Sequence, residues 1–247
     1  MTSKVKKKPL EEWEIQRDDY LKNTKGPSFF GVKLDEYQQE FRDSVLDDDI
    51  KIVFCNAKAG SGKTFIAAGC AEMLVKSGKY DGIIYITAPV QEPNMGFLPG
   101  TVEEKTDIYS EPFIIALEKI GVNPYVAVKH SDEDNKYSTA YIECRPHNYL
   151  RGLDIENKAI VIDEAQNFKT SELKKVLTRM HDNCKIIVIG HCGQVDLKID
   201  TISGFRSYLK AAEDGIEERP WMRVCNLVNN YRGIVSTWAD SVEKIKE

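Results

Sequence analysis

Short runs of consecutive apolar residues alternate along the chain with segments in which apolar residues recur every three or four positions. Four runs are Ile52 to Cys55, Ile83 to Ile86, Ala159 to Ile162 and Ile186 to Ile189. Continuous apolar runs of roughly 4–8 residues are typical of strands buried on both faces of a parallel sheet. Strands alternating with helical segments predict an α/β fold: a doubly wound, mainly parallel sheet with helices on both faces.

The segments between these runs predict the helices. Helical spacing covers Asp35 to Leu46, the segment from the first glycine-rich turn to Ser77, Glu103 to Gly121 with an interruption at Pro112, about Thr170 to His181, and a last helix that carries Ile234, Val235, Trp238, Val242 and Ile245. The helix that ends at Ser77 is expected to bury a single face, composed of Ile66, Cys70, Met73 and Leu74. Further strands are predicted at Ser138 to Cys144 and at Met222 to Val228. The polar stretch from Asn123 to Lys136 is expected to be exposed.

Two regions differ in composition and suggest the domain organisation. Residues 1–33 are charged with scattered aromatic residues, and Gly26-Pro27-Ser28 breaks any helix there. We interpret this region as an N-terminal arm. The remaining residues, 34–247, are enough for one large α/β domain with a substantial core.

Charge and cysteine content restrict the class of protein. The formal net charge is −5, which argues against a strongly basic nucleic-acid binder. The six cysteines include no Cys-x-x-Cys pair, so reduced core thiols in a cytoplasmic protein are expected rather than a disulfide framework or a zinc site. No apolar run approaches the length that spans a membrane, so no membrane partner is expected.

The most informative stretch is Ala57 to Thr64, which reads Ala-Lys-Ala-Gly-Ser-Gly-Lys-Thr and lies between a predicted strand and a predicted helix. A glycine-rich turn that opens a helix directs successive N–H groups and the positive end of the helix dipole at one anion. Lys63 is suited to neutralise the β- and γ-phosphates of ATP, and the Thr64 hydroxyl to bind Mg²⁺. The predicted nucleotide-binding residues here are Ala59, Gly60, Ser61, Gly62, Lys63, Thr64 and Phe65. The usual pattern has glycine at its first position, where this chain has Ala57.

A second group of candidate residues, Asp163-Glu164, follows the apolar run Ala159 to Ile162. In an open parallel sheet the carboxyl ends of the strands line the ligand crevice, so both carboxylates are expected to face the phosphate loop. We assign Asp163 to Mg²⁺ binding and Glu164 to orienting and deprotonating an attacking water. The alternative is an acidic helix N-terminus without a catalytic role, which is common in proteins.

With these motifs the chain resembles the PhoH-like ATPases over about residues 36 to 245. The resemblance rests on Gly60-Ser61-Gly62-Lys63-Thr64, Gly96-Phe97-Leu98-Pro99-Gly100 with Glu104-Lys105, Tyr149-Leu150-Arg151-Gly152, Asp163-Glu164-Ala165-Gln166-Asn167 and the stretch from Gly190 to Leu197. It implies a RecA-like core related to superfamily one helicases, with ATP hydrolysis and, in some members, RNA unwinding. Some longer relatives carry an N-terminal nuclease domain, and we do not expect one in this chain.

The resemblance also implies roles for single residues. Gln38 corresponds to a glutamine that reads adenine, with Gln39 as the competing candidate, and Thr87 corresponds to a residue that touches the nucleic-acid backbone. Gln194 corresponds to the glutamine that senses the γ-phosphate through a water. The family usually has Gly-Asp before that glutamine, whereas this chain has Gly190-His191. The missing aspartate puts coupling to Mg²⁺ in doubt, and the alternative is that His191 is a plain loop residue.

Two arginines complete the set of candidates. Arg232 lies where relatives have an arginine near the chain end, and a guanidinium suits the charge that develops in phosphoryl transfer; the alternative is a surface arginine at a helix start. Arg151 is a candidate for contact with a neighbour's nucleotide or a nucleic-acid phosphate. A single RecA-like domain leaves half of an ATP site open to water, so a head-to-tail ring is expected, a hexamer by the resemblance, with Arg232 acting in trans.

Two other functions compete with an ATPase that acts on RNA or single-stranded DNA. A thymidine-type nucleoside kinase also combines a Gly-Lys-Thr loop with an Asp-Glu-Ala-Gln strand end, but it usually has a Cys-x-x-Cys lobe, and it offers no role for Phe97-Leu98-Pro99-Gly100. An ATP-gated nucleic-acid clamp with little turnover is consistent with the departures at Ala57 and His191.

Overall fold

The structure, a computed structural model, describes residues 26–88, 102–129, 139–150, 152–193 and 203–242. Six strands form one sheet in the spatial order β5-β4-β6-β7-β3-β8, and every neighbouring pair is parallel. The strands are β3 (Ile52–Ala57), β4 (Ile83–Thr87), β5 (Ile142–Pro146), β6 (Ala159–Asp163), β7 (Lys185–Gly190) and β8 (Met222–Leu227). The predicted doubly wound parallel sheet is confirmed.

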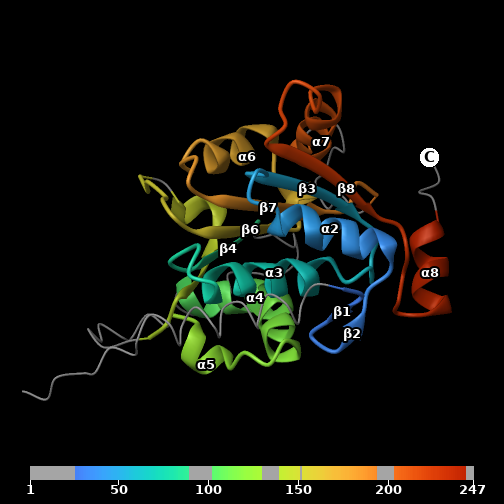
Figure 1. Cartoon of the computed structure of the whole chain (residues 1–247), viewed down its shortest axis with the longest axis horizontal. Coiled ribbons are helices and arrows are strands. Elements are labelled where there is room, and N and C mark those ends of the chain that lie inside the picture. The colour runs from blue at the N-terminus through green and yellow to red at the C-terminus, as the bar shows by residue number, and fades with distance from the viewer. Residues whose placement is uncertain (1–25, 89–101, 130–138, 151, 194–202, 243–247) are drawn as a thin grey trace, which may run out of the picture.

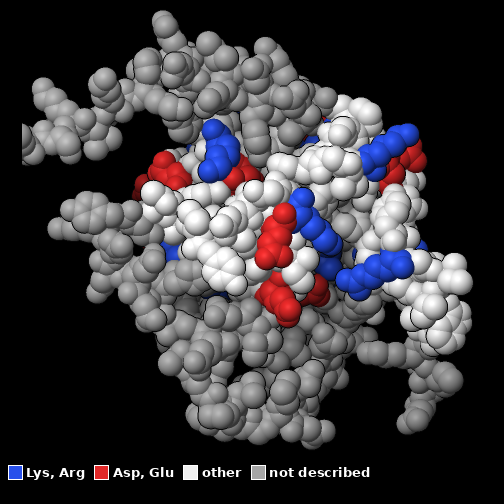
Figure 2. Space-filling view, turned by 90° about the horizontal axis from the view of Figure 1, so that it is seen from below, with Lys and Arg blue, Asp and Glu red and all other residues white. Residues whose placement is uncertain are grey.

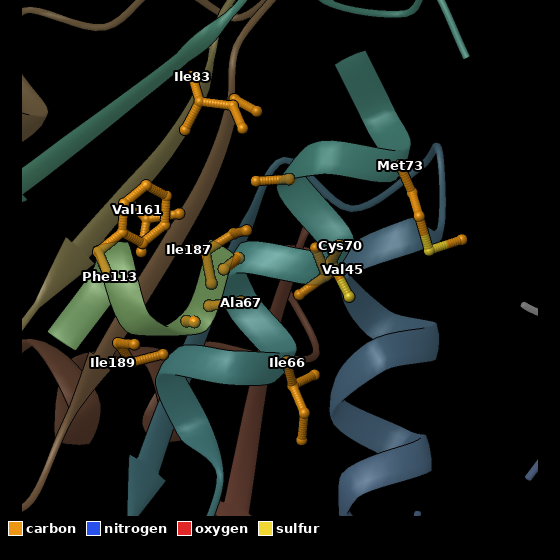
Figure 3. Packing of buried hydrophobic residues seen from close by; sticks show 14 of the residues in the cluster. Val45, Ile66, Ala67, Cys70, Met73, Ile83, Phe113, Val161, Ile187 and Ile189 are labelled. Atoms are coloured by element: carbon orange, nitrogen blue, oxygen red, sulfur yellow. The ribbon is translucent and has the colours of Figure 1, made fainter. Parts of the chain in front are cut away.

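One face of the sheet is covered by four helices, α2 (Glu36–Leu46), α3 (Lys63–Lys76), α4 (Val102–Lys119) and α5 (Pro124–Ala127). Alternate strand residues point to this side, among them Val161 and Ile187, and meet Ile66, Ala67 and Phe113 from the helices in a continuous apolar core (Figure 3). The helix α3 lies over the middle of the sheet between α2 and α4 (Figure 1). This packing holds the start of α3, and hence the glycine-rich turn, at one end of the strands.

The other face is covered by α6 (Thr170–Leu177) and α7 (Gly204–Asp214) (Figure 1). The intervening strand residues, such as Phe54, Ile160 and Val188, pack here against Leu173 and Phe205 in a second core. Two 3₁₀ turns, η1 (His147–Leu150) and η2 (Ala165–Asn167), follow the carboxyl ends of β5 and β6. Since both faces of each central strand are buried, continuous apolar runs rather than alternating ones are what this sheet requires.

Several helix predictions need correction. The helix α4 continues through Pro112, because Phe113, Ala116 and Leu117 are buried against the sheet side of the core and compensate for the hydrogen bond that proline cannot donate. The helix α3 is buried on nearly all sides, since α2 and α4 flank it. The helix α6 ends at Leu177, four residues before His181.

Two further segments differ from expectation. Asn123 caps the short helix α5, and Ala127 is buried, so the predicted exposed stretch begins with a packed turn; its continuation at 130–138 lies outside the described residues. The helix α7 was not predicted, although Phe205, Leu209 and Ala212 are buried at a helical spacing.

The first and last described elements differ in how they pack: the first inserts into the core and the last does not. A hairpin of β1 (Ser28–Phe29) and β2 (Val32–Lys33) precedes α2 and inserts Phe29 into the first core. The last helix, α8 (Ile234–Ser241), stands apart from the layers at the right of Figure 1. All six cysteines are free. Among the described residues, no helix combines the length and the apolar character that crossing a bilayer requires.

Candidate functional site

The phosphate loop joins the end of β3 to the start of α3 and has the backbone shape that an anion cradle needs. Gly60 (φ 70°) and Gly62 (φ 81°) both adopt the left-handed region, and Gly62 caps α3 with no side chain over its free N–H groups. A Cβ on Gly60 would lie 2.6 Å from Asn230 Oδ1, so the chain itself closes one side of the loop. Ala57 is the last residue of β3 and lies before the turn, where no left-handed conformation is required.

Two side-chain contacts join this loop to the carboxyl end of β6. The Thr64 hydroxyl donates a hydrogen bond to Asp163 Oδ2 (2.9 Å), and Lys63 Nζ lies 3.1 Å from Glu164 Oε1. The loop and the acidic pair come together because α3 crosses the sheet above β6. Asp163 and Glu164 therefore both contact the phosphate loop, as the sequence predicted.

Burial and charge act against each other at this junction. Burial raises the pKa of Asp163, and the adjacent Glu164 carboxylate raises it further, while Lys63 opposes the shift. Burial works to lower the pKa of Lys63, but the carboxylates of Asp163 and Glu164 outweigh it, and that pKa lies above its ordinary value. Tyr85, buried on β4, also donates a hydrogen bond to Asp163 Oδ2 (3.2 Å).

The backbone and side chain of Glu164 are both held in an unusual way. Its φ of 50° and ψ of 40° are left-handed, a conformation that a non-glycine residue adopts only when its surroundings hold it there, and such residues cluster at functional sites. The carboxylate accepts a hydrogen bond from Gln166 Nε2. Gln166 is buried, and its Oε1 accepts a hydrogen bond from the His191 N–H (2.9 Å) just after β7. Gln166 therefore links Glu164 to the end of the adjacent strand.

The two glutamines of α2 that compete for the adenine have different surroundings. Gln38 is buried beside the loop, where its Nε2 donates to the Ser61 carbonyl (2.9 Å) and its Oε1 accepts from the Asp35 N–H (3.0 Å). Gln39 donates to the Leu34 carbonyl (3.1 Å), away from the loop. Of the two, only Gln38 reaches the loop, and both ends of its amide already have partners within the protein.

The segment after β8 lies against the phosphate loop of the same chain. The Tyr231 N–H donates to the Gly60 carbonyl (2.9 Å), and the Arg232 side chain approaches so closely that a Cβ on Gly60 would lie 2.8 Å from Arg232 Cγ. A cleft of about 670 Å³ opens here between the loop, α4 and this segment, with Lys63, Thr64, Ile115 and Arg232 among its lining residues. Arg232 thus reaches its own chain's loop without a neighbouring subunit.

The remaining predicted residues are placed as follows. Thr87 ends β4 opposite Asp163 in the strand register, one strand away from the acidic pair. His191 contributes its backbone N–H to Gln166, at the position where the family usually has aspartate. Arg151, Gln194 and the loop Gly96 to Gly100 lie outside the described residues.

Sequence reasoning missed three residues of this site. Gln166 belongs to the Asp-Glu-Ala-Gln-Asn motif, but no role was predicted for it. Tyr85 has the pattern of an ordinary core aromatic residue. Tyr231 precedes Arg232, and only the arginine was predicted to act in the site. Only Gln166 had a usable signal, its place two residues after Glu164. Tyr85 and Tyr231 reach the site through strand pairing and loop packing that no local pattern reveals.

The residues present fit a nucleoside triphosphate with a divalent cation. The Ser61 hydroxyl is buried in the loop with no hydrogen-bond partner, and the left-handed glycines leave the α3 N-terminus open. Thr64 and Asp163 offer hard oxygen ligands side by side, the type that Mg²⁺ prefers.

Comparisons with known proteins support this assignment. The family model described as "PhoH-like protein" matches residues 32–228. The PhoH-like protein of Bacillus subtilis (strain 168) is 32% identical over 203 residues, which cover 81% of this chain and 60% of that protein. The PhoH-like protein of Mycobacterium tuberculosis (strain H37Rv) is 34% identical over 194 residues, covering 78% of this chain and 51% of the relative. The chain thus spans about half to three-fifths of the length of these relatives.

Among solved structures, the large terminase of bacteriophage HK97 superposes with a TM-score of 0.51. It is 12% identical, and the match covers 85% of this chain and 43% of the terminase. At that level of identity the similarity concerns the fold alone. It agrees with the parallel sheet and the phosphate loop described above.

Proposed function

The chain belongs to the PhoH-like protein family, and on that premise we propose that it hydrolyses ATP with Mg²⁺. The observation that carries the proposal is the double connection between the phosphate loop and β6. Thr64 contacts Asp163 (2.9 Å) and Lys63 contacts Glu164 (3.1 Å), so residues for phosphate, metal and water meet at one point. A chance glycine-rich turn would have no reason to meet a buried aspartate and a partly exposed glutamate at the end of the next strand but one.

Each side chain has a task in this proposal. The N–H groups of the loop and Lys63 bind the β- and γ-phosphates, and Thr64 and Asp163 hold the cation. When bound, Mg²⁺ supplies positive charge that offsets the charge developing on the phosphate oxygens. Glu164 orients a water toward the γ-phosphorus and accepts its proton. Burial raises the pKa of Asp163, and the Lys63 ammonium opposes that shift.

The pairing of Lys63 with Glu164 implies a sequence of events. Glu164, the proposed general base, is paired with Lys63, the lysine proposed to bind the phosphates. A bound triphosphate competes for Lys63 and releases the Glu164 carboxylate, which Gln166 retains in position. Substrate binding then creates the base that the reaction needs.

We propose that Gln38 reads the adenine and that Gln194 senses the γ-phosphate. Because Asp35 and Ser61 occupy the Gln38 amide, adenine recognition requires an exchange of these hydrogen bonds. Arg232 was expected to act in trans. Because its side chain lies against Gly60 of the same chain, we propose that it acts on the nucleotide bound by its own chain. Mixing Lys63→Ala with Arg232→Ala subunits separates the alternatives: no recovery of activity supports action in cis, and recovery supports the trans role.

RNA or single-stranded DNA is the proposed macromolecular partner, with Thr87 and Arg151 as contacts and a hexameric ring as the working assembly. The family resemblance supports this part of the proposal. Unwinding of a duplex is the furthest-reaching activity that the resemblance suggests. The described surface in Figure 2 has lysine and arginine next to aspartate and glutamate rather than a field of one sign. On this face, a nucleic acid would therefore contact single cationic side chains and not a broad basic field.

The experiment that tests the proposed function measures phosphate release from ATP and Mg²⁺ without added nucleoside. Release that depends on Lys63 and is stimulated by RNA or single-stranded DNA supports the motor. Formation of ADP and a nucleoside monophosphate only when a nucleoside is added, with no release of phosphate, indicates the kinase. Tight nucleic-acid binding with negligible release indicates the clamp. Lys76→Ala, at the other end of α3, is the matched control for Lys63→Ala.

A further inference from the structure

Asn56 interrupts the apolar strand β3 just before the phosphate loop begins. Phe54 packs in the second core, and because side chains alternate along a strand, Asn56 points to the same face of the sheet. In the strand register, Asn56 lies opposite Gly190 on β7 and opposite Asn226 on β8. A polar side chain therefore lies between the carboxyl ends of two neighbouring strands, at the edge of an otherwise apolar core.

The amide of Asn56 holds the segment that follows β7. Its Oδ1 accepts a hydrogen bond from the Cys192 N–H (3.1 Å), and its Nδ2 donates a longer one to Asn226 Oδ1 (3.4 Å). The Cys192 carbonyl accepts a hydrogen bond from Arg206 Nη2 (2.9 Å) on α7. The backbone of Cys192 is therefore fixed from two sides, from β3 through its N–H and from α7 through its carbonyl.

The residue before Cys192 contacts the proposed reaction site. The His191 N–H donates to Gln166 Oε1 (2.9 Å), and Gln166 Nε2 donates to the Glu164 carboxylate. Gln166 fits there because Gly190 has no side chain: a Cβ on Gly190 would lie 2.9 Å from Gln166 Oε1. Two consecutive N–H groups are thus held by two different side-chain amides, one on β3 and one beside the proposed base.

Together these contacts form a closed circuit that begins and ends at the phosphate loop. Lys63 Nζ lies 3.1 Å from Glu164 Oε1, and Gln166 holds the same carboxylate. From Gln166 the circuit continues through the backbone of residues 191–192 to Asn56, which the chain joins directly to the loop. Because each member is held at both ends, the circuit restricts the orientation of the Glu164 carboxylate more than a single hydrogen bond does.

We propose that Asn56 is a positioning residue for ATP hydrolysis, which acts on Glu164 through the backbone of residues 191–192 and through Gln166. This inference rests on the proposed function, because that function assigns the attacking water to Glu164. Asn56 itself touches neither the proposed phosphate ligands nor the proposed metal ligands in the printed contacts of its side chain. Its role is therefore to orient the base, not to bind the nucleotide.

Loss of the Asn56 oxygen should slow the reaction more than it weakens binding. Without that acceptor the Cys192 N–H is released, and the neighbouring His191 N–H is no longer aimed as firmly at Gln166. The proposed base is then less well oriented, and a misplacement of about 1 Å can cost up to about 10²-fold in rate. Lys63 and Thr64 keep their contacts with the β6 end, so nucleotide affinity should change little.

The kcat for phosphate release and the Kd of a nonhydrolysable ATP analogue, both measured on the full chain, test the proposal. We expect Asn56→Ala to lower kcat about fivefold and to change Kd less than about twofold. Asn183→Ala is the matched control, because the Asn183 Oδ1 also accepts a backbone N–H, that of Asn157 (3.2 Å), but before the start of β7 at the opposite edge of the sheet. It should leave both quantities unchanged.

A double-mutant cycle with Gln166→Ala distinguishes positioning from a general loosening of the site. If Asn56 acts through Gln166, the double variant should lose about tenfold in kcat, as Gln166→Ala alone does, whereas independent effects would multiply to about fiftyfold. Multiplied losses, equal losses in kcat and in binding, or an Asn56→Ala variant as active as the wild type each overturn this inference alone. A wild-type chain that releases no phosphate overturns the proposed ATPase function and this inference with it.

Discussion

The helices α3 and α8 are both rich in apolar residues, yet one is enclosed and the other is open. In α3 every residue from Ile66 to Leu74 is buried, including Gly69 and Glu72, because the sheet lies beneath the helix and α2 and α4 lie on either side. In α8, by contrast, the side chains of Ile234 and Val235 are largely exposed. The comparison shows that apolar composition does not by itself decide whether a helix is enclosed within the described part of the chain. The elements packed beside the helix decide it.

The largest effect is expected at the start of the enclosed helix. Lys63→Ala removes the ammonium that pairs with Glu164 and that we propose binds the phosphates, so phosphate release should fall on the order of 10³-fold while the fold is retained. Steady-state phosphate release with circular dichroism as the folding check measures this. A loss below tenfold would contradict the assignment of this loop as the reaction centre.

Truncation of the α3 core should be the next largest effect. Ile66→Ala opens a cavity in the closely packed first core, which should lower the free energy of unfolding by about 2–4 kcal/mol. Urea denaturation followed by circular dichroism measures the loss. An effect under 1 kcal/mol would mean that α3 is not enclosed as described.

The buried side chain of Lys185, at the start of β7, should make the free energy of unfolding depend on pH. Burial lowers the pKa of Lys185 to about 8, and its ammonium donates hydrogen bonds to the carbonyls of Asp47 and Ile50. Between this pKa and the ordinary value of 10.5, the unfolded chain holds a proton that the folded chain has lost, so stability rises with pH in that window. Between pH 7.5 and pH 10, the free energy of unfolding of the wild type should rise by about 2 kcal/mol relative to that of Lys185→Met, as measured in urea titrations. A difference that stays constant with pH would contradict the shifted pKa.

Loss of the Gln166 link should affect catalysis more than nucleotide binding. Gln166→Ala leaves the Glu164 carboxylate without its hydrogen bond, so kcat should fall roughly tenfold with little change in the Kd of an ATP analogue. Gln39→Ala, which removes a glutamine side chain away from the loop, is the control. Equal losses in kcat and in binding would indicate a general structural role instead.

The smallest effect is expected on α8. Trp238→Ala, measured at concentrations below those of assembly, should change the free energy of unfolding by less than about 0.5 kcal/mol, because the side chain is exposed. The contrast with Ile66→Ala is the direct test of the two helices' environments. A loss above 1 kcal/mol in the monomer would show that α8 packs against its own chain.

Much of the fold was predictable because the signals are local. Apolar runs such as Ala159 to Ile162 identify buried strands, the Asp35 cap marks the start of α2, and a Gly-x-Gly-Lys-Thr turn between a strand and a helix leaves few structural alternatives. The helix α7 could also have been predicted, because Phe205, Leu209 and Ala212 follow the helical period. The alignment of Thr64 with Asp163 followed from the rule that parallel strands end at one edge.

By itself the sequence determined the six strands of the parallel sheet, the phosphate loop and the acidic strand end, because each is specified by residues that are close together in the chain. The short hairpin of β1 and β2 was not predicted. Tertiary structure alone decided which glutamine of α2 meets the loop, that Tyr85 contacts Asp163, and that Arg232 lies against its own Gly60. It also decided that α3 is enclosed and α8 is not. These outcomes depend on contacts between residues far apart in the chain, whose geometry is set by the packing of whole layers and not by any local pattern.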